Sequence, residues 1–319
     1  MPRHFLSVTD FSPAQVRDCL LLANDIKLHP ENYRQTLAGQ TLAMIFQKKS
    51  TRTRVSFEVG MYQLGGHALF LSSADIQIGR GETIADTAQV ISRYCNGIMA
   101  RVYGHEIVEE LAKFATVPII NGLSDLEHPC QTMCDAQTLI EHWSPKGTYD
   151  PSVLRGKTLC YVGDGNNMAH SLLDVGAATG MNVTIVAPKG YWPDPKIVAR
   201  CEELGRETGS KIVITDDVIN GVRGADCIYT DVWASMGQEE EHDKRVRDFD
   251  GFIVDESMMQ RADNGRTGPG CLFMHCLPAH RGEEVSAEVC DGPRSIIFDE
   301  AENRLHIQKA ILVTLMAKR

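Results

Sequence analysis

The sequence lacks several features that would assign it to a broad class of protein. No apolar run approaches the roughly 18 residues that suggest a membrane-spanning helix. The net charge is −10, so the chain has no general excess of basic residues for binding nucleic acid non-specifically. The stretch 1–9 is too short and too weakly basic to predict a transit peptide. We find no internal repeat and no low-complexity tract.

The spacing of the cysteines excludes one class of motif. Ten cysteines are scattered along 319 residues without a C-x-x-C pair, which favours reduced thiols in a cytoplasmic protein over a disulfide framework. Hydrophobic residues make up 43% and charged residues 23%, which is typical of a globular protein. The length suggests about two domains. We therefore predict a cytoplasmic protein of the size of an enzyme.

Short apolar stretches alternate with helical patterns in both halves of the chain. The first half predicts strands at 41–46, 67–71, 97–102 and 117–121, with helices at 84–94, 106–115 and 131–142. The second half predicts strands at 158–162, 183–187, 211–214, 226–230 and 272–275, with helices at 169–179 and 196–208. This alternation predicts an α/β fold in which parallel sheets are covered by helices on both faces.

The boundary between the two halves is marked by composition. Residues 144–152 (SPKGTYDPS) are rich in Pro, Gly and Ser and form the best candidate linker. We predict a first domain at 1–143, a second at 152–303 and a C-terminal helix within 304–319. Periodicity leaves open whether this helix closes the second domain or packs back on the first. Two such domains predict an active site in the cleft between them, because ligands bind at the carboxyl ends of parallel strands.

The stretch Ser50-Thr51-Arg52-Thr53-Arg54 follows the first predicted strand. Ser50 lies where a helix N-cap is expected, and hydroxyl residues occupy the first turn. Free N–H groups at a helix start bind anions, and guanidinium groups bind phosphate through paired hydrogen bonds. This stretch predicts a phosphate site. The alternative is a capped surface helix with solvated arginines.

Two further stretches of the first half could carry chemistry. Arg101 ends a predicted strand at the edge where ligands bind, although a solvated arginine is an equal alternative. His128 and Gln131 begin the next helix and offer an imidazole to polarise a carbonyl and a carboxamide to hold an amide. Cys130 and Cys134 with His128 also raise the alternative of zinc. That spacing lacks a convincing fourth ligand.

The second half begins with a glycine-rich turn, Gly163-Asp164-Gly165-Asn166-Asn167-Met168. Met168 replaces the third glycine of a dinucleotide fingerprint, and the following strand ends without a carboxylate for a ribose. A nicotinamide dehydrogenase is therefore a weak alternative. The side-chain amides of Asn166 and Asn167 become the more interesting groups.

Two later strand ends present a carboxylate and a thiol. Asp231, followed by Ser235 and Met236, could pair with a substrate ammonium or could simply cap a loop. Cys276 follows the last predicted strand, where a thiol could act on the proton of a nucleophile or could serve only in packing. No G-x-S-x-G elbow is present to support a hydrolase.

Taken together, these motifs resemble the aspartate/ornithine carbamoyltransferase family over essentially the full length. STRTR (50–54), HPCQ (128–131), DxxxSMG (231–237) and HCLP (275–278) occur in the order of the family. SMG with HCLP is similar to the ornithine branch. Lys48-Lys49 departs from the Lys-Pro expected before Ser50, a change that removes no ligand.

The resemblance implies a role for each motif position. Carbamoyl phosphate would be bound by Ser50, Thr51, Arg52, Thr53, Gln77, Arg101, His128, Gln131, Cys276, Leu277 and Arg304. Ornithine would be bound by Asn167, Asp231, Ser235 and Met236. Arg101, His128 and Cys276 would be catalytic. The domain at 1–143 would then bind carbamoyl phosphate and the domain at 152–303 ornithine.

The resemblance also implies the reaction and the assembly. The carbamoyl group would pass to the δ-amine of L-ornithine, giving L-citrulline and phosphate in arginine metabolism, with the biosynthetic direction expected. It implies no metal and no organic cofactor. Gln77 would reach into the site of a neighbouring subunit, making a homotrimer or a multiple of trimers. The alternatives are a carbamoyltransferase for putrescine or N-acetylornithine, which Asp231 and SMG disfavour, and a non-catalytic phosphate-ligand-binding module.

Overall fold

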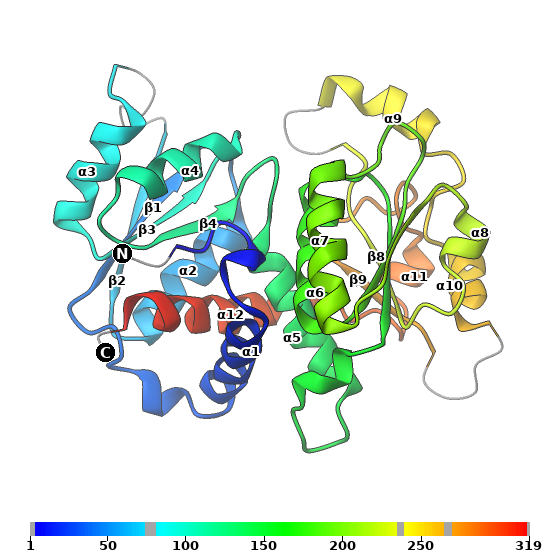
Figure 1. Cartoon of the computed structure of the whole chain (residues 1–319), viewed down its shortest axis with the longest axis horizontal. Helices are drawn as coiled ribbons and strands as arrows, with labels where there is room; N and C mark the ends of the chain where they lie inside the picture. The colour runs from blue at the N-terminus through cyan, green and yellow to red at the C-terminus, as the bar shows by residue number, and fades with distance from the viewer. Residues whose placement is uncertain (1–3, 74–80, 235–238, 265–269, 318–319) are drawn as a thin grey trace. The chain divides into compact units, whose positions relative to one another are not determined.

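The computed structural model describes residues 4–73, 81–234, 239–264 and 270–317. The chain divides into two compact units, one formed by Met1–Pro151 with Glu302–Arg319 and the other by Ser152–Ala301. Each unit contains its own parallel sheet with helices around it, as predicted (Figure 1). The predicted linker, 144–152, ends at the division between the units.

The first unit is built on a four-stranded sheet in the order β2-β1-β3-β4. Its strands are β1 (Thr41–Phe46), β2 (His67–Ser72), β3 (Gly97–Arg101) and β4 (Ile119–Leu123). All neighbouring strands are parallel. Its helices are α1 (Pro13–Leu28), α2 (Thr51–Gln63), α3 (Ile84–Tyr94), α4 (His105–Phe114), α5 (Pro129–Trp143) and most of α12 (Ile297–Met316).

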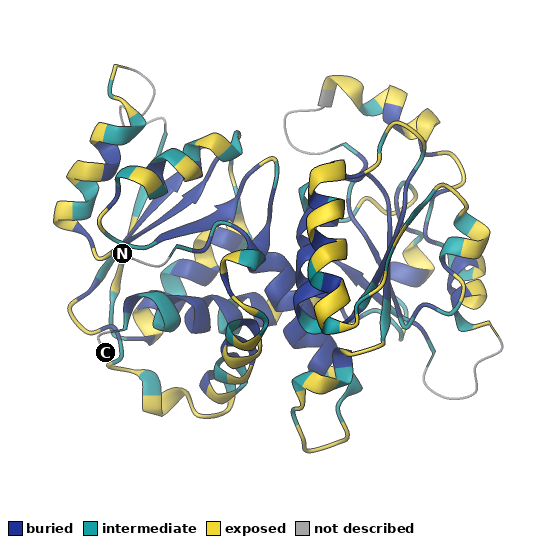
Figure 2. Cartoon of the chain, in the orientation of Figure 1, coloured by how far each residue is buried: buried dark blue, intermediate teal, exposed yellow. Residues whose placement is uncertain are grey.

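The alternation of side chains along the strands explains how this sheet is covered. Ala43 and Ile45 of β1 belong to a buried cluster that includes Val108 and Leu111 of α4. Successive strand residues point to opposite faces, so Leu42 and Met44, which are also fully buried, face the other side. Both faces of β1, β3 and β4 are therefore largely buried, as their dark colour in Figure 2 shows, whereas the residues of the edge strand β2 are exposed or half-buried.

Several predicted boundaries differ from the observed ones, mostly by one or two residues, and two of the differences have a clear physical reason. We predicted a strand from 117, but β4 begins at Ile119, because Pro118 has no N–H to donate to a sheet ladder. We also predicted a C-terminal helix within 304–319, but α12 begins earlier, at Ile297. The first turn of α12 carries Phe298, which is exposed, and the acidic pair Asp299 and Glu300, so the apolar pattern that predicted the helix starts late.

Helix α12 packs closely on α2 at a glycine. A Cβ added at Gly60 would lie 3.3 Å from Cγ of Lys309 and 3.8 Å from Cδ1 of Leu305. Lys309 also donates a 2.9 Å hydrogen bond from Nζ to the side chain of Gln63. The small residue on α2 thus allows the two helices to approach.

The second unit contains a five-stranded parallel sheet in the order β7-β6-β5-β8-β9. Its strands are β5 (Thr158–Val162), β6 (Asn182–Val186), β7 (Ile212–Thr215), β8 (Cys227–Thr230) and β9 (Leu272–His275). Its helices are α6 (Asn167–Thr179), α7 (Pro195–Thr208), α8 (Val218–Gly221), α9 (His242–Asp248), α10 (Glu256–Asp263) and α11 (Ala287–Cys290). From β5 the chain continues to β6 and β7 on one side of this strand and then to β8 and β9 on the other side. In such folds, ligands bind at the carboxyl ends of the two strands where the order reverses, which here are β5 and β8.

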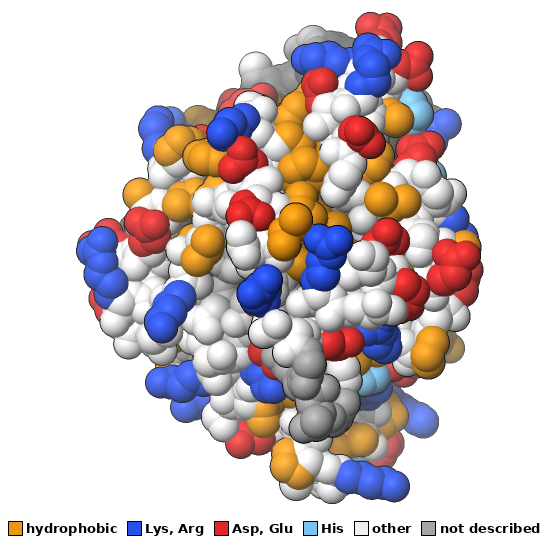
Figure 3. All heavy atoms as spheres, turned by 90° about the vertical axis from the view of Figure 1, so that its right-hand side faces the viewer, with side chains coloured by type: hydrophobic (Ala, Val, Ile, Leu, Met, Phe, Trp, Pro, Cys, Tyr) orange, Lys and Arg blue, Asp and Glu red, His pale blue; other side chains and the backbone are white. Residues whose placement is uncertain are grey.

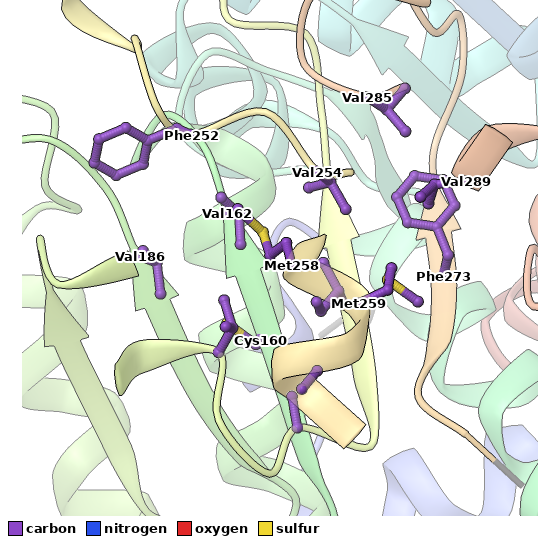
Figure 4. Close-up of a cluster of buried hydrophobic side chains, with 14 of the residues drawn as sticks. Cys160, Val162, Val186, Phe252, Val254, Met258, Met259, Phe273, Val285 and Val289 are labelled. Atoms are coloured by element: carbon purple, nitrogen blue, oxygen red, sulfur yellow. The ribbon is translucent and has the colours of Figure 1, made fainter. Parts of the chain in front are cut away.

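One hydrophobic core of the second unit lies between this sheet and α10. Cys160 and Val162 of β5 pack with Met258 and Met259 of α10 and with Phe273 of β9 (Figure 4). These side chains are all less than 5% exposed. Packing in this core holds β5, β8 and β9 in place, and these strands in turn position the loops that follow their carboxyl ends.

The surface and the thiols agree with the composition. Acidic and basic side chains are interspersed on the face shown in Figure 3, with no broad area of one sign. No helix among the described residues is long and apolar enough to cross a membrane. All ten cysteines are free thiols; nine are buried and Cys276 is partly exposed.

Candidate active site

The start of α2 has the features of an anion site. Ser50 is the N-cap residue, and its Oγ accepts a 3.2 Å hydrogen bond from the backbone N–H of Thr53, which confirms the predicted cap. The first turn contains no acidic residue. The positive end of the helix dipole is therefore not offset by a carboxylate in the first turn of the helix.

The two arginines of the STRTR motif have different environments. Arg54 pairs with Glu58 at 2.9 Å and lies over the ring of Phe70, with 3.7 Å between Cζ and the ring centre. Arg52 instead contributes positive charge at the buried His128. Arg54 therefore stabilises the helix surface, and Arg52 belongs with the candidate phosphate site.

The hydroxyl of Thr53 joins two further arginines. Arg101, at the carboxyl end of β3, donates from Nη1 to Oγ1 of Thr53 at 3.3 Å. Arg304 of α12 donates from Nη2 to the same oxygen at 3.4 Å. All three residues are at most 5% exposed. Two guanidinium groups from distant segments thus meet at the start of α2, and charge is concentrated there despite the acidic composition of the chain.

Gln131 orients one of these guanidinium groups. Its Oε1 accepts a hydrogen bond from Nη1 of Arg304, and its Nε2 donates to Oδ1 of Asp135 at 2.8 Å. Asp135 is fully buried one turn along α5. The carboxylate therefore fixes which end of the amide faces Arg304.

His128 is a buried imidazole among cations. It is 6% exposed and lies immediately before α5. Burial lowers its pKa well below the usual value, and the positive charges of Arg304, Arg101 and Arg52 lower it further. The ring is therefore neutral near pH 7 and can donate one hydrogen bond without carrying charge.

In the second unit, a carboxylate and a thiol meet at the ends of β8 and β9. The thiol of Cys276 donates to Oδ1 of Asp231 at 3.2 Å. The same oxygen accepts from the N–H of Val232 at 2.8 Å. Asp231 is 8% exposed and Cys276 is partly exposed. Because neighbouring parallel strands end at one edge of the sheet, these two predicted residues come together.

Buried hydrogen bonds hold the backbone after Cys276. The N–H of Leu277 donates to Nδ1 of His275 at 2.9 Å, so the proton of this ring is on Nε2 and points to Oε1 of Glu284 at 3.2 Å. Leu277 has a φ of +58°, a left-handed conformation that is rare for a branched residue. The His275–Glu284 pair therefore holds an unusual turn next to the thiol.

The glycine-rich turn after β5 serves packing. A Cβ on Gly165 would lie 2.4 Å from the backbone nitrogen of Pro193, so only glycine fits. Asn166 is the N-cap of α6, and its Oδ1 accepts from the N–H of Met168 at 2.9 Å. Asn167 is then the first residue of α6, at the same sheet edge as Asp231.

Comparison with known proteins agrees with this arrangement. Residues 3–141 match the family described as "Aspartate/ornithine carbamoyltransferase, carbamoyl-P binding domain", and residues 155–315 match "Aspartate/ornithine carbamoyltransferase, Asp/Orn binding domain". The chain belongs to the aspartate/ornithine carbamoyltransferase family. The sequence is 50% identical over 316 residues to the ornithine carbamoyltransferase of Thermococcus kodakarensis, covering 98% of this chain and 96% of the relative.

Solved structures of the carbamoyltransferase family have the same fold. The ornithine carbamoyltransferase from Pyrococcus furiosus superposes with a TM-score of 0.91 at 49% identity, covering 99% of this chain and 97% of that one. The anabolic ornithine carbamoyltransferase from Campylobacter jejuni has a TM-score of 0.89 at 38% identity, covering 98% of each chain.

Three of the residues expected from the family resemblance lie outside the described residues: Gln77, Ser235 and Met236. Within the described ranges, the predicted zinc alternative finds little support. Cys130 donates to the backbone oxygen of Asn121 at 3.4 Å, and burial raises the pKa of its thiol to about 12. The groups of metal-ligating side chains found there include neither Cys130 nor Cys134.

Sequence reasoning missed the residues that support the predicted ones. Asp135, Glu284 and Asn303 are each fully buried and were not among the expected site residues. The sequence offered one signal, for Asp135: this acidic residue lies four positions after Gln131, and side chains four residues apart share a helix face. The other two depend on contacts that spacing alone does not reveal.

Proposed function

We propose that this chain is an ornithine carbamoyltransferase, which transfers the carbamoyl group of carbamoyl phosphate to the δ-amine of L-ornithine and yields L-citrulline and phosphate. The observation that carries the proposal is the meeting of Arg101 and Arg304 on Thr53 at the start of α2, beside the neutral His128. The relatives named ornithine carbamoyltransferase support it at about half identity over nearly the full length.

The first unit would bind carbamoyl phosphate. The start of α2 offers Ser50, Thr51 and Thr53 together with Arg52 for the phosphate oxygens. Arg101 would span phosphate and carbamoyl oxygen, and Arg304 would complete the positive site. His128 would donate its single hydrogen bond to the carbamoyl oxygen. Gln77 would be contributed by a neighbouring subunit.

Gln131 has a supporting part in this proposal. Its amide is engaged by Arg304 and Asp135, so its first effect would be to hold the guanidinium in place. The amine of the carbamoyl group would then lie near the Gln131 side chain. The carbamoyl-phosphate domain would comprise residues 1–143 together with the C-terminal segment that begins at Arg304.

The second unit, at residues 152–303, would bind ornithine. Asp231 would accept the α-ammonium group, a role suited to a carboxylate at a strand end. Asn167, Ser235 and Met236 would line the amino-acid end. Cys276 and Leu277 would lie near the reacting δ-amine, held by the turn that His275 and Glu284 support.

The reaction needs positioning and charge stabilisation. The neutral δ-amine attacks the carbamoyl carbon, a C–N bond forms, and the C–O bond to phosphate breaks. Negative charge that develops on the carbamoyl oxygen would be stabilised by Arg101 and His128 as preorganised donors. The departing phosphate, surrounded by guanidinium groups, can accept the proton released by the amine.

Assembly, direction and location complete the proposal. We propose a homotrimer, or a multiple of one, in the cytoplasm; light scattering on the pure protein tests the assembly. The biosynthetic direction is favoured because relatives from Pyrococcus furiosus and Campylobacter jejuni are named anabolic.

The activity is tested by a panel of amines. The pure protein is incubated with carbamoyl phosphate and ornithine, aspartate, putrescine or N-acetylornithine, and ureido product and phosphate are measured. We expect product from ornithine alone. Product from another amine would overturn the assignment of the second unit, and no product with any amine would leave a phosphate-ligand-binding module.

A further inference from the structure

A buried polar network lies on α12 next to the arginine of the candidate phosphate site. At its centre is Asn303, which is 0% exposed and precedes Arg304. Its Nδ2 donates to Oγ1 of Thr138 at 3.0 Å and to Oε2 of Glu141 at 2.8 Å. Its Oδ1 accepts from Nζ of Lys27 at 2.9 Å and from Nε2 of Gln137 at 3.3 Å. Both donors and both acceptor positions of this amide are used.

The network is specific for one register of α12. Thr138, Gln137 and Glu141 lie on α5, and Lys27 lies on α1, so Asn303 ties three helices together. Sliding a helix by one residue moves each side chain about 1.5 Å along the axis and turns it by about 100°. A single buried asparagine is known to specify helix register in this way, because other registers leave its polar groups unpaired.

The same helix α5 carries the partner of Arg304. Gln131 accepts from Arg304, and it lies seven residues before Thr138, which accepts from Asn303. Seven residues correspond to about 10.5 Å along the helix. Asn303 and Arg304, which are adjacent on α12, therefore contact α5 at two points about two helical turns apart. A shift of α12 along its axis would break both contacts at once.

We infer that Asn303 is a positioning residue for carbamoyl phosphate: it fixes α12 against α5 so that Arg304 meets Thr53 and Gln131. Asn303 itself does not touch the substrate. This inference rests on the proposed function and adds a second layer behind its phosphate site. The Lys27–Glu141 ion pair, at 3.0 Å, keeps the network in place around the amide.

The test is a double-mutant cycle in the full-length protein. Asn303→Ala should raise the KM for carbamoyl phosphate and the Kd for inorganic phosphate by roughly tenfold, since small displacements of a positioned group weaken its contribution strongly. The KM for ornithine should change less than about twofold, because mutations at distant, independent sites affect each other by no more than about that factor. In an Arg304→Ala background, Asn303→Ala should have no further effect on phosphate binding.

Two control variants separate positioning from general loss of stability. Leu312→Ala removes a fully buried side chain from the same helix without touching the network, and it should leave phosphate binding unchanged. Asn303→Asp with Glu141→Gln exchanges donor and acceptor across the 2.8 Å contact and should restore part of the binding that Asn303→Asp alone loses, because the donation to Thr138 is not restored.

Several results would overturn the inference. Equal loss of phosphate binding in Leu312→Ala would show that any destabilisation of α12 has this effect. A full additional loss in the Arg304→Ala background would show that Asn303 acts independently of Arg304. Absence of transferase activity in the unmutated protein would defeat the proposed function, while the phosphate-binding cycle would still decide the role of Asn303.

Discussion

His128 is predicted to act as a neutral hydrogen-bond donor at all pH values where the enzyme works. Two variants are informative. His128→Gln keeps a side-chain N–H donor but cannot titrate, and His128→Ala removes the donor as well. Loss of one preorganised donor typically lowers kcat by about 10²–10³-fold. We expect a loss in that range for His128→Ala and a smaller one for His128→Gln.

The pH dependence follows from the environment of the ring. Burial and the charges of Arg304, Arg101 and Arg52 lower the pKa of His128 well below its usual value. A histidine with the ordinary pKa of about 6.5 would go from roughly 90% neutral at pH 7.5 to roughly 10% neutral at pH 5.5. Its contribution to the rate would then fall by nearly tenfold. With the lowered pKa, no such fall should occur.

The assay compares the rate of citrulline formation by the original enzyme with that by His128→Gln across this pH range. The ratio removes the protonation of the amine substrate, which affects both enzymes equally. We expect a constant ratio. A ratio that falls about tenfold on acidification would mean that His128 titrates normally, and the proposed neutral donor would be wrong.

Three other changes have defined outcomes. Asp231→Asn should raise the KM for ornithine by roughly 10- to 100-fold, as expected for loss of a charged partner, while the Kd for inorganic phosphate stays unchanged in calorimetry. Ser50→Ala should cost about 1 kcal/mol of unfolding free energy by loss of the helix cap, measured in urea; an unchanged value would show that the cap is not stabilising. Burial, with the charges of Lys309 and Lys27, lowers the pKa of His306 to about 3, so its neutral form stabilises the fold above pH 6.5 and this stability is lost as the pH falls. Between pH 7 and pH 5, His306→Gln should therefore lose about 2 kcal/mol less unfolding free energy than the unmodified chain, and equal losses would contradict the assignment.

Local sequence patterns were sufficient for most of the fold. The strands at 41–46, 158–162 and 272–275 were predicted with the observed bounds, because each is a short apolar run followed by a turn or a helix start. Arg101 was predicted at the end of a strand, and His128 and Asp231 were predicted in segments that follow strands; the parallel sheets place them there. Connectivity of β and α segments thus determines which residues share an edge.

The support behind the site could not be predicted in this way. Lys27 and Asn303 are separated by 276 positions in the chain, and His275 and Glu284 pair across a turn that requires a left-handed leucine. Such contacts depend on how helices pack, and neither residue type nor spacing identifies the partner. The start of α12 was missed for the related reason that its first turn contacts its surroundings through polar groups such as Glu300, which accepts from Tyr229.

The uneven burial of the thiols gives the protein a natural point of chemical attachment. Burial raises the pKa of both Cys19 and Cys130 to about 12, so these thiols stay protonated and unreactive toward alkylating reagents. Cys276 alone among the ten is partly exposed. A fluorescent or spin probe should therefore couple there without any engineered cysteine, and its signal would report directly on events at the turn after β9.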